Sequence, residues 1–143
     1  MLLTVKKSET CGCVEIPGSK SHTVRAVFIA GLAEGRSVIV NPLISGDTLS
    51  AIAVCSAFGA GIRNEGDRLL IDGVNAAPSL PEDVVDVGNS GTTLRFGMMT
   101  AGLMNGYTVL TGDSQIRRRP LGPLIAAMNT LGAEVFSTRG NKM

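Results

Sequence analysis

The chain carries the same succession of turn residues and apolar runs twice, and this internal repeat restricts the fold more than any other feature. Three matches define the repeat. Gly18 and Arg25 match Gly88 and Arg95, which lie 70 residues further along the chain. Gly35 with 38–40 matches Gly106 with 109–111 at an offset of 71 residues, and 58–60 matches 131–133 at an offset of 73. Single strand–turn–helix echoes occur in any α/β protein. A nearly constant offset over separate features instead indicates two copies of one supersecondary unit, at about residues 14–74 and 84–143.

The periodicity and the turn residues predict the elements of each unit. In the first unit we expect strands over 14–16, 36–40, 60–63 and 68–71, and helices over 20–33 and 45–58. A polar connector, 75–83, follows. In the second unit we expect helices over 88–104 and 120–131, and strands over 107–111 and 133–136. The alternation predicts a mixed α/β (α+β) fold.

The first helix of each unit differs from the second. Residues 24–33 and 94–104 are apolar nearly all round, which predicts inner helices that are buried on every side. Stacked repeats share one core, and two units need not be a complete set. Because the chain stops at Gly140–Met143, directly after a predicted strand, we expect a piece of a longer protein.

Composition excludes several classes of protein. Hydrophobic residues make up 44% and charged residues 17%, and a net charge of +1 argues against binding to nucleic acid or to a membrane surface. No apolar run approaches the roughly 20 residues that span a bilayer. Cys11, Cys13 and Cys55, with no signal peptide, favour the reducing cytoplasm over a disulfide scaffold. The chain also lacks the ligand set that a zinc site needs, so no metal is expected.

The first candidate binding motif is residues 17–21, Pro-Gly-Ser-Lys-Ser. Unpaired N–H groups and the positive end of the dipole favour anions where a helix begins. Gly18 permits a tight turn, and Lys20 and Ser21 bring an ammonium and a hydroxyl group to the start of the helix. Arg25, about one turn further, offers a planar fork to a carboxylate or phosphate. Taken alone, such a motif is a purely structural turn as often as it is a binding site.

Two further motifs support an anion site. Residues 88–93 (Gly-Asn-Ser-Gly-Thr-Thr) offer amides and hydroxyls before Arg95, and Gly91 lets a ligand approach its amide closely. This motif is neither a Walker loop nor a dinucleotide-binding fingerprint. Arg119 precedes a helix with Pro120 at its start, whereas Arg117 and Arg118 fit a solvated loop equally well. Together the three motifs predict a site for one or two small polyanionic substrates.

Other polar residues are weaker candidates. His22 lies on an exposed first turn, and Asp83 and Asp86 lie in a loop where capping or solvation is their usual role. No nucleophile–base pair is present in the pattern.

The order and spacing of these motifs resemble a known family. Residues 17–21 with Arg25, 88–92 with Arg95, and Gly112-Asp113 leading to 119–122 (Arg-Pro-Leu-Gly) are similar to EPSP synthases, which are enolpyruvyl transferases. The similarity runs from about Val14 to the end of the chain. Ser21 favours this family over UDP-N-acetylglucosamine enolpyruvyl transferase, which has Asn after the Lys. That enzyme and a non-catalytic anion-binding repeat module remain the alternatives.

The resemblance implies a fold of two domains in an inside-out barrel, with three βαβαββ units in each and the active site between them. Residues 14–143 would then hold about two of the three units of the first, shikimate-binding domain. Residues 1–13, with a strand at about Leu2–Lys7, would pair with the second domain. The third unit and the second domain, which carries the acidic general base, would follow Met143.

The resemblance also implies a reaction, the transfer of the enolpyruvyl group of phosphoenolpyruvate to the 5-hydroxyl of shikimate 3-phosphate, without cofactor or metal. The matching positions imply that Lys20, Ser21 and Arg25 bind shikimate 3-phosphate. They imply that Lys20, Asn89, Gly91 and Arg119 bind phosphoenolpyruvate, with Lys20 nearest to the chemistry and no certain catalytic residue in this chain. Phe96 and Gln115 depart from the family pattern.

The resemblance leads to expectations about assembly as well. We expect a cytoplasmic, monomeric full-length enzyme that binds small anions and neither nucleic acid nor membrane. We expect the 143-residue chain alone to be inactive. Its unpaired first strand invites self-association.

Overall fold

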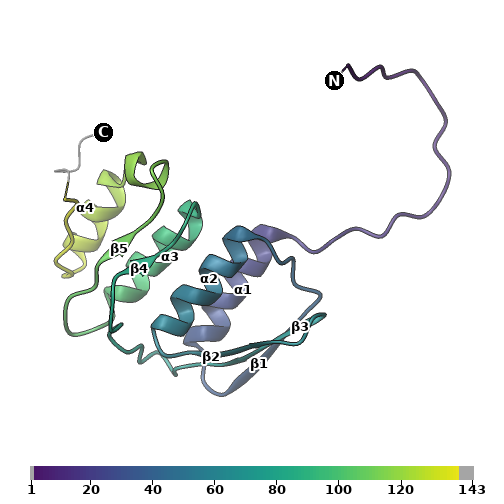
Figure 1. The fold of residues 1–143 in the computed structure, drawn as a ribbon. Helices are drawn as coiled ribbons and strands as arrows, with labels where there is room; N and C mark the ends of the chain where they lie inside the picture. The colour runs from purple at the N-terminus through teal and green to yellow at the C-terminus, as the bar shows by residue number, and fades with distance from the viewer. Residues whose placement is uncertain (1, 139–143) are drawn as a thin grey trace.

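The computed structural model describes residues 2–138 of the chain, which form two neighbouring groups of helices and strands (Figure 1). A long N-terminal segment extends away from both groups (Figure 1). The end of the predicted second unit, with the stop at Gly140–Met143, lies outside the described residues.

The first group follows the predicted order closely. It contains α1 (Lys20–Leu32), β1 (Arg36–Val40), α2 (Gly46–Ala57), β2 (Gly61–Asn64) and β3 (Arg68–Asp72). The strands form an antiparallel sheet in the order β1-β3-β2, with Val38 opposite Leu70 and Ile62 opposite Ile71. Leu69 and Ile71 alternate with more exposed residues on the central strand and are fully buried, as expected for a sheet with one covered face.

The second group has shorter strands than predicted. It contains β4 (Val85–Asp86), α3 (Gly91–Ala101), β5 (Leu110–Thr111), the 3₁₀ turn η1 (Ile116–Arg118) and α4 (Gly122–Thr130). β4 was not predicted, and it pairs with β5 in parallel. Of the predicted strand 107–111 only the last two residues pair. α3 begins three residues after Gly88, which lies at φ 56° in the preceding turn.

The strand predicted over 133–136 is absent from the structure. Here the Asn129 side chain replaces a neighbouring strand: its Oδ1 accepts from Val135 N at 2.7 Å and its Nδ2 donates to Val135 O at 3.0 Å. The apolar alternation of this segment was therefore correct evidence for an extended backbone but not for sheet pairing.

The strand predicted over 14–16 is also absent. Residues 2–17 belong to no strand, and no hydrogen bond joins residues 2–18 to another described part of the chain. A strand exists only where another strand satisfies its backbone groups. Leu2–Lys7 is likewise exposed and unpaired here, and its predicted pairing with a second domain stays a prediction.

One core runs through both groups. α2 packs between α1 and α3 (Figure 1). Val27 of α1, Val54 of α2, Leu69 of β3 and Val87, directly after β4, are fully buried in it. Side chains from both groups of helices and strands thus share one apolar interior.

The predicted burial of α1 and α3 on every side is wrong for the described residues. Ile29 of α1 is 71% exposed and Met99 of α3 is 48% exposed. Each helix buries one face, because among residues 2–138 its neighbours cover only that side. No helix within residues 2–138 is long and apolar enough to cross a membrane.

Candidate functional site

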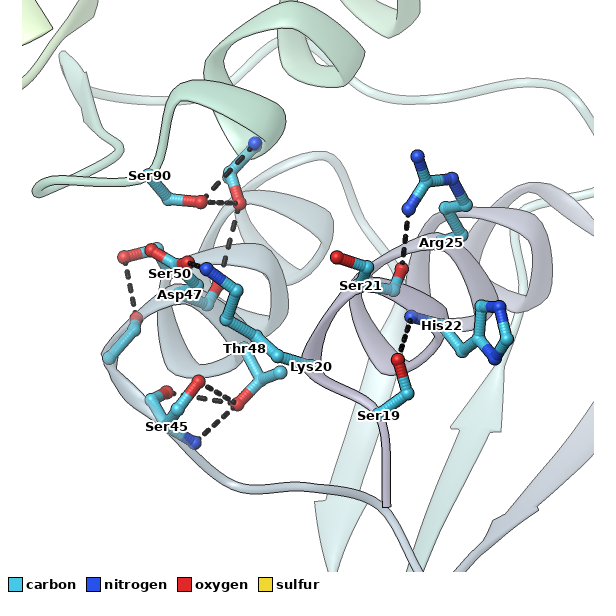
Figure 2. Close-up of polar contacts among 12 residues, drawn as sticks. Ser19, Lys20, Ser21, His22, Arg25, Ser45, Asp47, Thr48, Ser50 and Ser90 are labelled. Carbon is cyan, nitrogen blue, oxygen red and sulfur yellow. Dashed lines mark hydrogen bonds and ion pairs between the residues drawn. The ribbon is translucent and has the colours of Figure 1, made fainter. Parts of the chain in front are cut away.

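The N-terminal ends of three helices meet at one place in the structure (Figure 2). The Lys20 ammonium of α1 forms an ion pair with the Asp47 carboxylate in the first turn of α2. The Asp47 carbonyl oxygen accepts a hydrogen bond from the Thr93 hydroxyl of α3 at 3.4 Å. Each helix start contributes unpaired amides and a positive dipole end, so their convergence creates a place suited to an anion.

The turn before α1 is anchored to the loop that follows β1. The Ser19 carbonyl accepts from Thr23 Oγ1 at 2.9 Å, and Thr23 Oγ1 in turn accepts from Leu43 N at 3.1 Å. A Cβ at Gly18 would lie 2.5 Å from the Asn41 carbonyl oxygen. Glycine is therefore required here by the close approach of two backbones, and positive φ is not the reason, since Gly18 is not among the positive-φ residues.

Asp47 is a site residue that the sequence analysis missed. Its carboxylate holds the Lys20 ammonium at the junction of α1 and α2, with side chains 25% and 52% exposed respectively. At this exposure the pair contributes little to stability. The ion pair instead determines where the Lys20 ammonium group lies. The available signal was an acidic residue in a first helical turn, but only the packing of α2 against α1 brings it to Lys20.

Ser21 and Arg25 lie together on the exposed side of α1 (Figure 2). Arg25 Nη1 donates to the Ser21 carbonyl at 2.9 Å. The guanidinium carbon of Arg25 lies 6.0 Å from the centroid of the Phe96 ring of α3. The Phe96 ring packs edge-on against the Phe28 ring, with 5.4 Å between the two ring centroids. Phe96 thus places Arg25 of α1 against α3, the helix that follows the second candidate binding motif.

Two guanidinium groups converge over Gly91, the first residue of α3. Arg95 Nη1 donates to the Gly91 carbonyl at 2.9 Å. A Cβ at position 91 would lie 3.1 Å from Arg119 Nη1 and 3.2 Å from Arg95 Nη1. Within residues 2–138 neither arginine forms an ion pair with a carboxylate. The structure therefore brings predicted Arg119 to predicted Gly91 and adds Arg95 to the same cluster.

Asn89 supports the loop that carries Arg119. Its Nδ2 donates to Asp113 Oδ2 at 2.5 Å, while Asp113 Oδ1 accepts from the backbone amides of Gln115 and Ile116 at 2.9 Å each. The Ile116 amide is the main cause of a lowered pKa for Asp113, with further lowering from the Gln115 amide, Asn89 and Arg117. The predicted ligand contact of Asn89 stays a prediction, and its bracing role was not foreseen.

The weaker candidates have local roles. Asp86 Oδ1 accepts from Gly88 N at 2.8 Å and Asp83 Oδ1 from Val84 N at 2.6 Å, so both carboxylates bond to the loop backbone and neither caps a helix, since the N-cap of α3 is Ser90. His22 contributes its backbone amide to Ser19 Oγ at 3.4 Å. Arg117 and Arg118 are exposed, as a solvated loop requires.

Comparison with known proteins places these motifs in a family context. A sequence profile of EPSP synthase (3-phosphoshikimate 1-carboxyvinyltransferase) matches residues 5–143. The chain is 62% identical over 141 residues to a 3-phosphoshikimate 1-carboxyvinyltransferase of Acetivibrio thermocellus, with 99% of this chain and 33% of the relative covered. It is 55% identical over 142 residues to the protein of that name from Ruminiclostridium cellulolyticum, with 99% and 34% covered.

The fold has solved counterparts as well. The structure matches an EPSP synthase from Acinetobacter baumannii with a TM-score of 0.78 at 25% identity, over 92% of this chain and 31% of that one. The chain thus spans about a third of the length of the relatives that it matches.

Proposed function

The chain belongs to the EPSP synthase family, and we propose that it forms part of a site that transfers the enolpyruvyl group of phosphoenolpyruvate to the 5-hydroxyl of shikimate 3-phosphate. The observation that carries the proposal is that α1, α2 and α3 begin next to one another, with Lys20 at the start of α1 and with Arg95 and Arg119 over Gly91 at the start of α3. Addition followed by elimination passes through a strongly anionic tetrahedral intermediate. Fixed cations and helix amides stabilise such charge without reorganising.

We propose that the two helix starts divide the substrates between them. Lys20, Ser21 and Arg25 would bind shikimate 3-phosphate, and Gly91, Arg119 and Asn89 would bind phosphoenolpyruvate, with Lys20 shared. Two observations support the division: Ser21 and Arg25 lie together on α1, whereas Arg119 lies over Gly91 at the start of α3. Arg95 joins the second set because it flanks the same glycine.

Asp47 has a positioning role in this proposal. It holds the Lys20 ammonium between the two helix starts until an anionic substrate competes for it. Because Lys20 would contact both proposed substrates, its exact placement should affect the chemistry more than the affinity for either one.

The organisation proposed for the whole protein follows the family. Residues 14–143 would be part of a shikimate-binding domain, and 1–13 would pair with a second domain. The chain spans about a third of its relatives' length. We therefore expect no turnover from the 143-residue chain by itself. A cytoplasmic location and a monomeric whole enzyme belong to the same proposal. The family match gives no support to the UDP-N-acetylglucosamine enzyme or to a non-catalytic module.

A chimera provides the test. This chain would replace the matching third of the A. thermocellus relative, with which it shares 62% identity. We expect the chimera to release phosphate when given both substrates and to lose most activity with Lys20→Ala. Arg63→Ala, on the exposed edge strand β2, is the control and should leave the rate unchanged.

The proposal fails if the folded chimera is inactive while the unmodified relative is active in the same assay. It also fails for Lys20 if Lys20→Ala retains full turnover, as the Arg63→Ala control should. Circular dichroism and a thermal unfolding scan would establish that each variant is folded before its rate is interpreted.

A further inference from the structure

The described N-terminal segment carries two exposed cysteines with one residue between them. Cys11 and Cys13 are free and exposed, and Gly12 between them adopts φ 144°, a conformation that glycine reaches readily. A Cβ at Gly12 would meet nothing within 4 Å. Among residues 2–138, no hydrogen bond holds this part of the backbone to the folded core.

This arrangement allows the two sulfurs to reach one another. The Cα atoms of residues i and i+2 are at most about 7 Å apart, and a disulfide needs about 4.4–6.8 Å. A glycine hinge lets the backbone bend into that range, and Cys11 and Cys13 lie beyond the stretch Leu2–Lys7 for which a pairing strand is proposed. Since only one residue separates the cysteines, little chain entropy opposes ring closure.

We propose that Cys11 and Cys13 form a reversible thiol-oxidation site that closes an intrachain disulfide on reaction with a small disulfide such as glutathione disulfide. One cysteine thiolate attacks a sulfur of glutathione disulfide and expels the first glutathione. The second cysteine attacks the resulting mixed disulfide and expels the second glutathione. The two cysteines are oxidised, the small disulfide is reduced, and the two thiol protons end on the two glutathiones.

The small ring makes the bond labile. Exposed or strained disulfides have higher reduction potentials than structural ones, so they form and break as the surrounding thiol pool changes. This lability reconciles the site with a reducing compartment, where disulfides are transient and redox-sensing.

Cys55 of α2 supplies an internal contrast. It is 5% exposed, its Sγ lies 3.9 Å from the Val27 carbonyl oxygen, and burial raises its pKa to about 12. A buried thiol that stays protonated is neither a nucleophile nor accessible to an oxidant. Oxidation should therefore be confined to Cys11 and Cys13.

The test is a glutathione redox titration of the 143-residue chain, followed by alkylation and intact-mass measurement. In oxidising buffer we expect a monomer lighter by two hydrogen atoms, without retained glutathione. Cleavage after Lys7 and Lys20 should yield the peptide 8–20 with both sulfurs joined. Cys11→Ser and Cys13→Ser should each retain one glutathione instead, because the mixed disulfide has no second thiol to resolve it.

Cys55→Ser should close the ring as the wild type does. Because that substitution alters the core, the peptide map of the wild-type chain gives the same information without it. The proposal is overturned if the wild type keeps a glutathione on each cysteine, if it forms disulfide-linked dimers, or if peptide 8–20 stays reduced in every buffer. Alkylation of Cys55 in the folded chain at the rate of Cys11 would also contradict it.

Discussion

The starts of α1 and α3 share a local geometry but differ in charge. At both, the hydroxyl of an N-cap serine accepts a hydrogen bond from a backbone amide at 3.4 Å: Ser19 accepts from His22, and Ser90 accepts from Thr93. At both, an arginine donates to the carbonyl four residues earlier at 2.9 Å, Arg25 to Ser21 and Arg95 to Gly91. At α1 the nearby ammonium is neutralised by Asp47, whereas at α3 two guanidinium groups meet without a carboxylate in an ion pair among residues 2–138.

The difference indicates that matching residues give the two helix starts the same local geometry, whereas residues from neighbouring elements set the charge at each one. The α1 site has a balanced cation, which suits a role in positioning. The α3 site has uncompensated positive charge, so it should bind an anion more strongly and respond more to ionic strength. The predictions below test this contrast in the chimera, from the largest expected effect to the smallest.

The largest effect should follow the loss of Arg119. Arg119→Ala removes one of the two guanidinium groups over Gly91. Charged hydrogen bonds contribute about 1.5–3 kcal/mol, so the KM for phosphoenolpyruvate should rise about 10- to 100-fold. Arg118→Ala is the control and should leave the KM unchanged, because the nearest side chains to Gly91 are those of Arg119 and Arg95 and not that of Arg118. If the two substitutions raised the KM equally, the effect would come from the overall charge of the loop and not from a specific contact of Arg119.

A smaller but specific effect should come from Gly91→Ala. The new Cβ would lie within 3.1–3.2 Å of both guanidinium groups and displace them. Overpacking of this kind costs about 1–3 kcal/mol, and we expect about a tenfold rise in the KM for phosphoenolpyruvate. Gly122→Ala is the matched control, since Gly122 is also the first residue of a helix and its Cβ would meet nothing within 4 Å.

Phe96→Leu should weaken the α1 site alone. The ring lies under Arg25, and an exposed cation–π contact contributes about 0.5–1 kcal/mol. We expect the KM for shikimate 3-phosphate to rise about two- to fivefold, with that for phosphoenolpyruvate unchanged. Phe96→Tyr keeps an aromatic ring at this position, so its KM for shikimate 3-phosphate should equal that of the wild type. A parallel rise for both substrates would mean that Phe96 acts only through the packing of α3.

The smallest effect concerns the brace below Arg119. Hydrogen bonds lower the pKa of Asp113 in the folded state, so this carboxylate contributes stability above its unfolded pKa and loses it as pH falls through the folded pKa. Asp113→Asn should therefore be less stable than the wild type at neutral pH, and the two should converge below about pH 4. Urea unfolding between pH 7 and pH 3 measures this, and parallel curves would contradict it.

Much of the fold could be predicted from local patterns. The bounds of β1 were predicted to the residue, and those of α1, α2 and β3 nearly so, because their turn residues and apolar runs are strong and short-range. The strands over 14–16 and 133–136 were wrong for the same physical reason. An extended, alternating segment becomes a strand only when a partner satisfies its backbone, and no local pattern reports whether that partner is present.

The candidate site divides along the same line. The sequence predicted Lys20, Arg25, Gly91 and Arg119 as binding residues from their places near helix starts; the structure brings Arg119 to Gly91, and the binding roles stay predictions. It missed Asp47 and the bracing role of Asn89, because each acts on a residue far along the chain. It also assigned Gly18 to a tight turn, whereas the approach of the Asn41 carbonyl is what excludes a side chain there.

By itself, then, the sequence determined where α1 begins and which arginines follow the starts of α1 and α3 by about one turn, since these relations span only a few residues; it placed the start of α3 three residues too early. The tertiary structure decided which helix starts meet. The packing of α2 between α1 and α3 brings Asp47 to Lys20 and the carbonyl of Asp47 to Thr93. The return of the chain through β5 and η1 brings Arg119 to Gly91. Such contacts depend on how the shared apolar core packs, and core packing is a property of the whole chain.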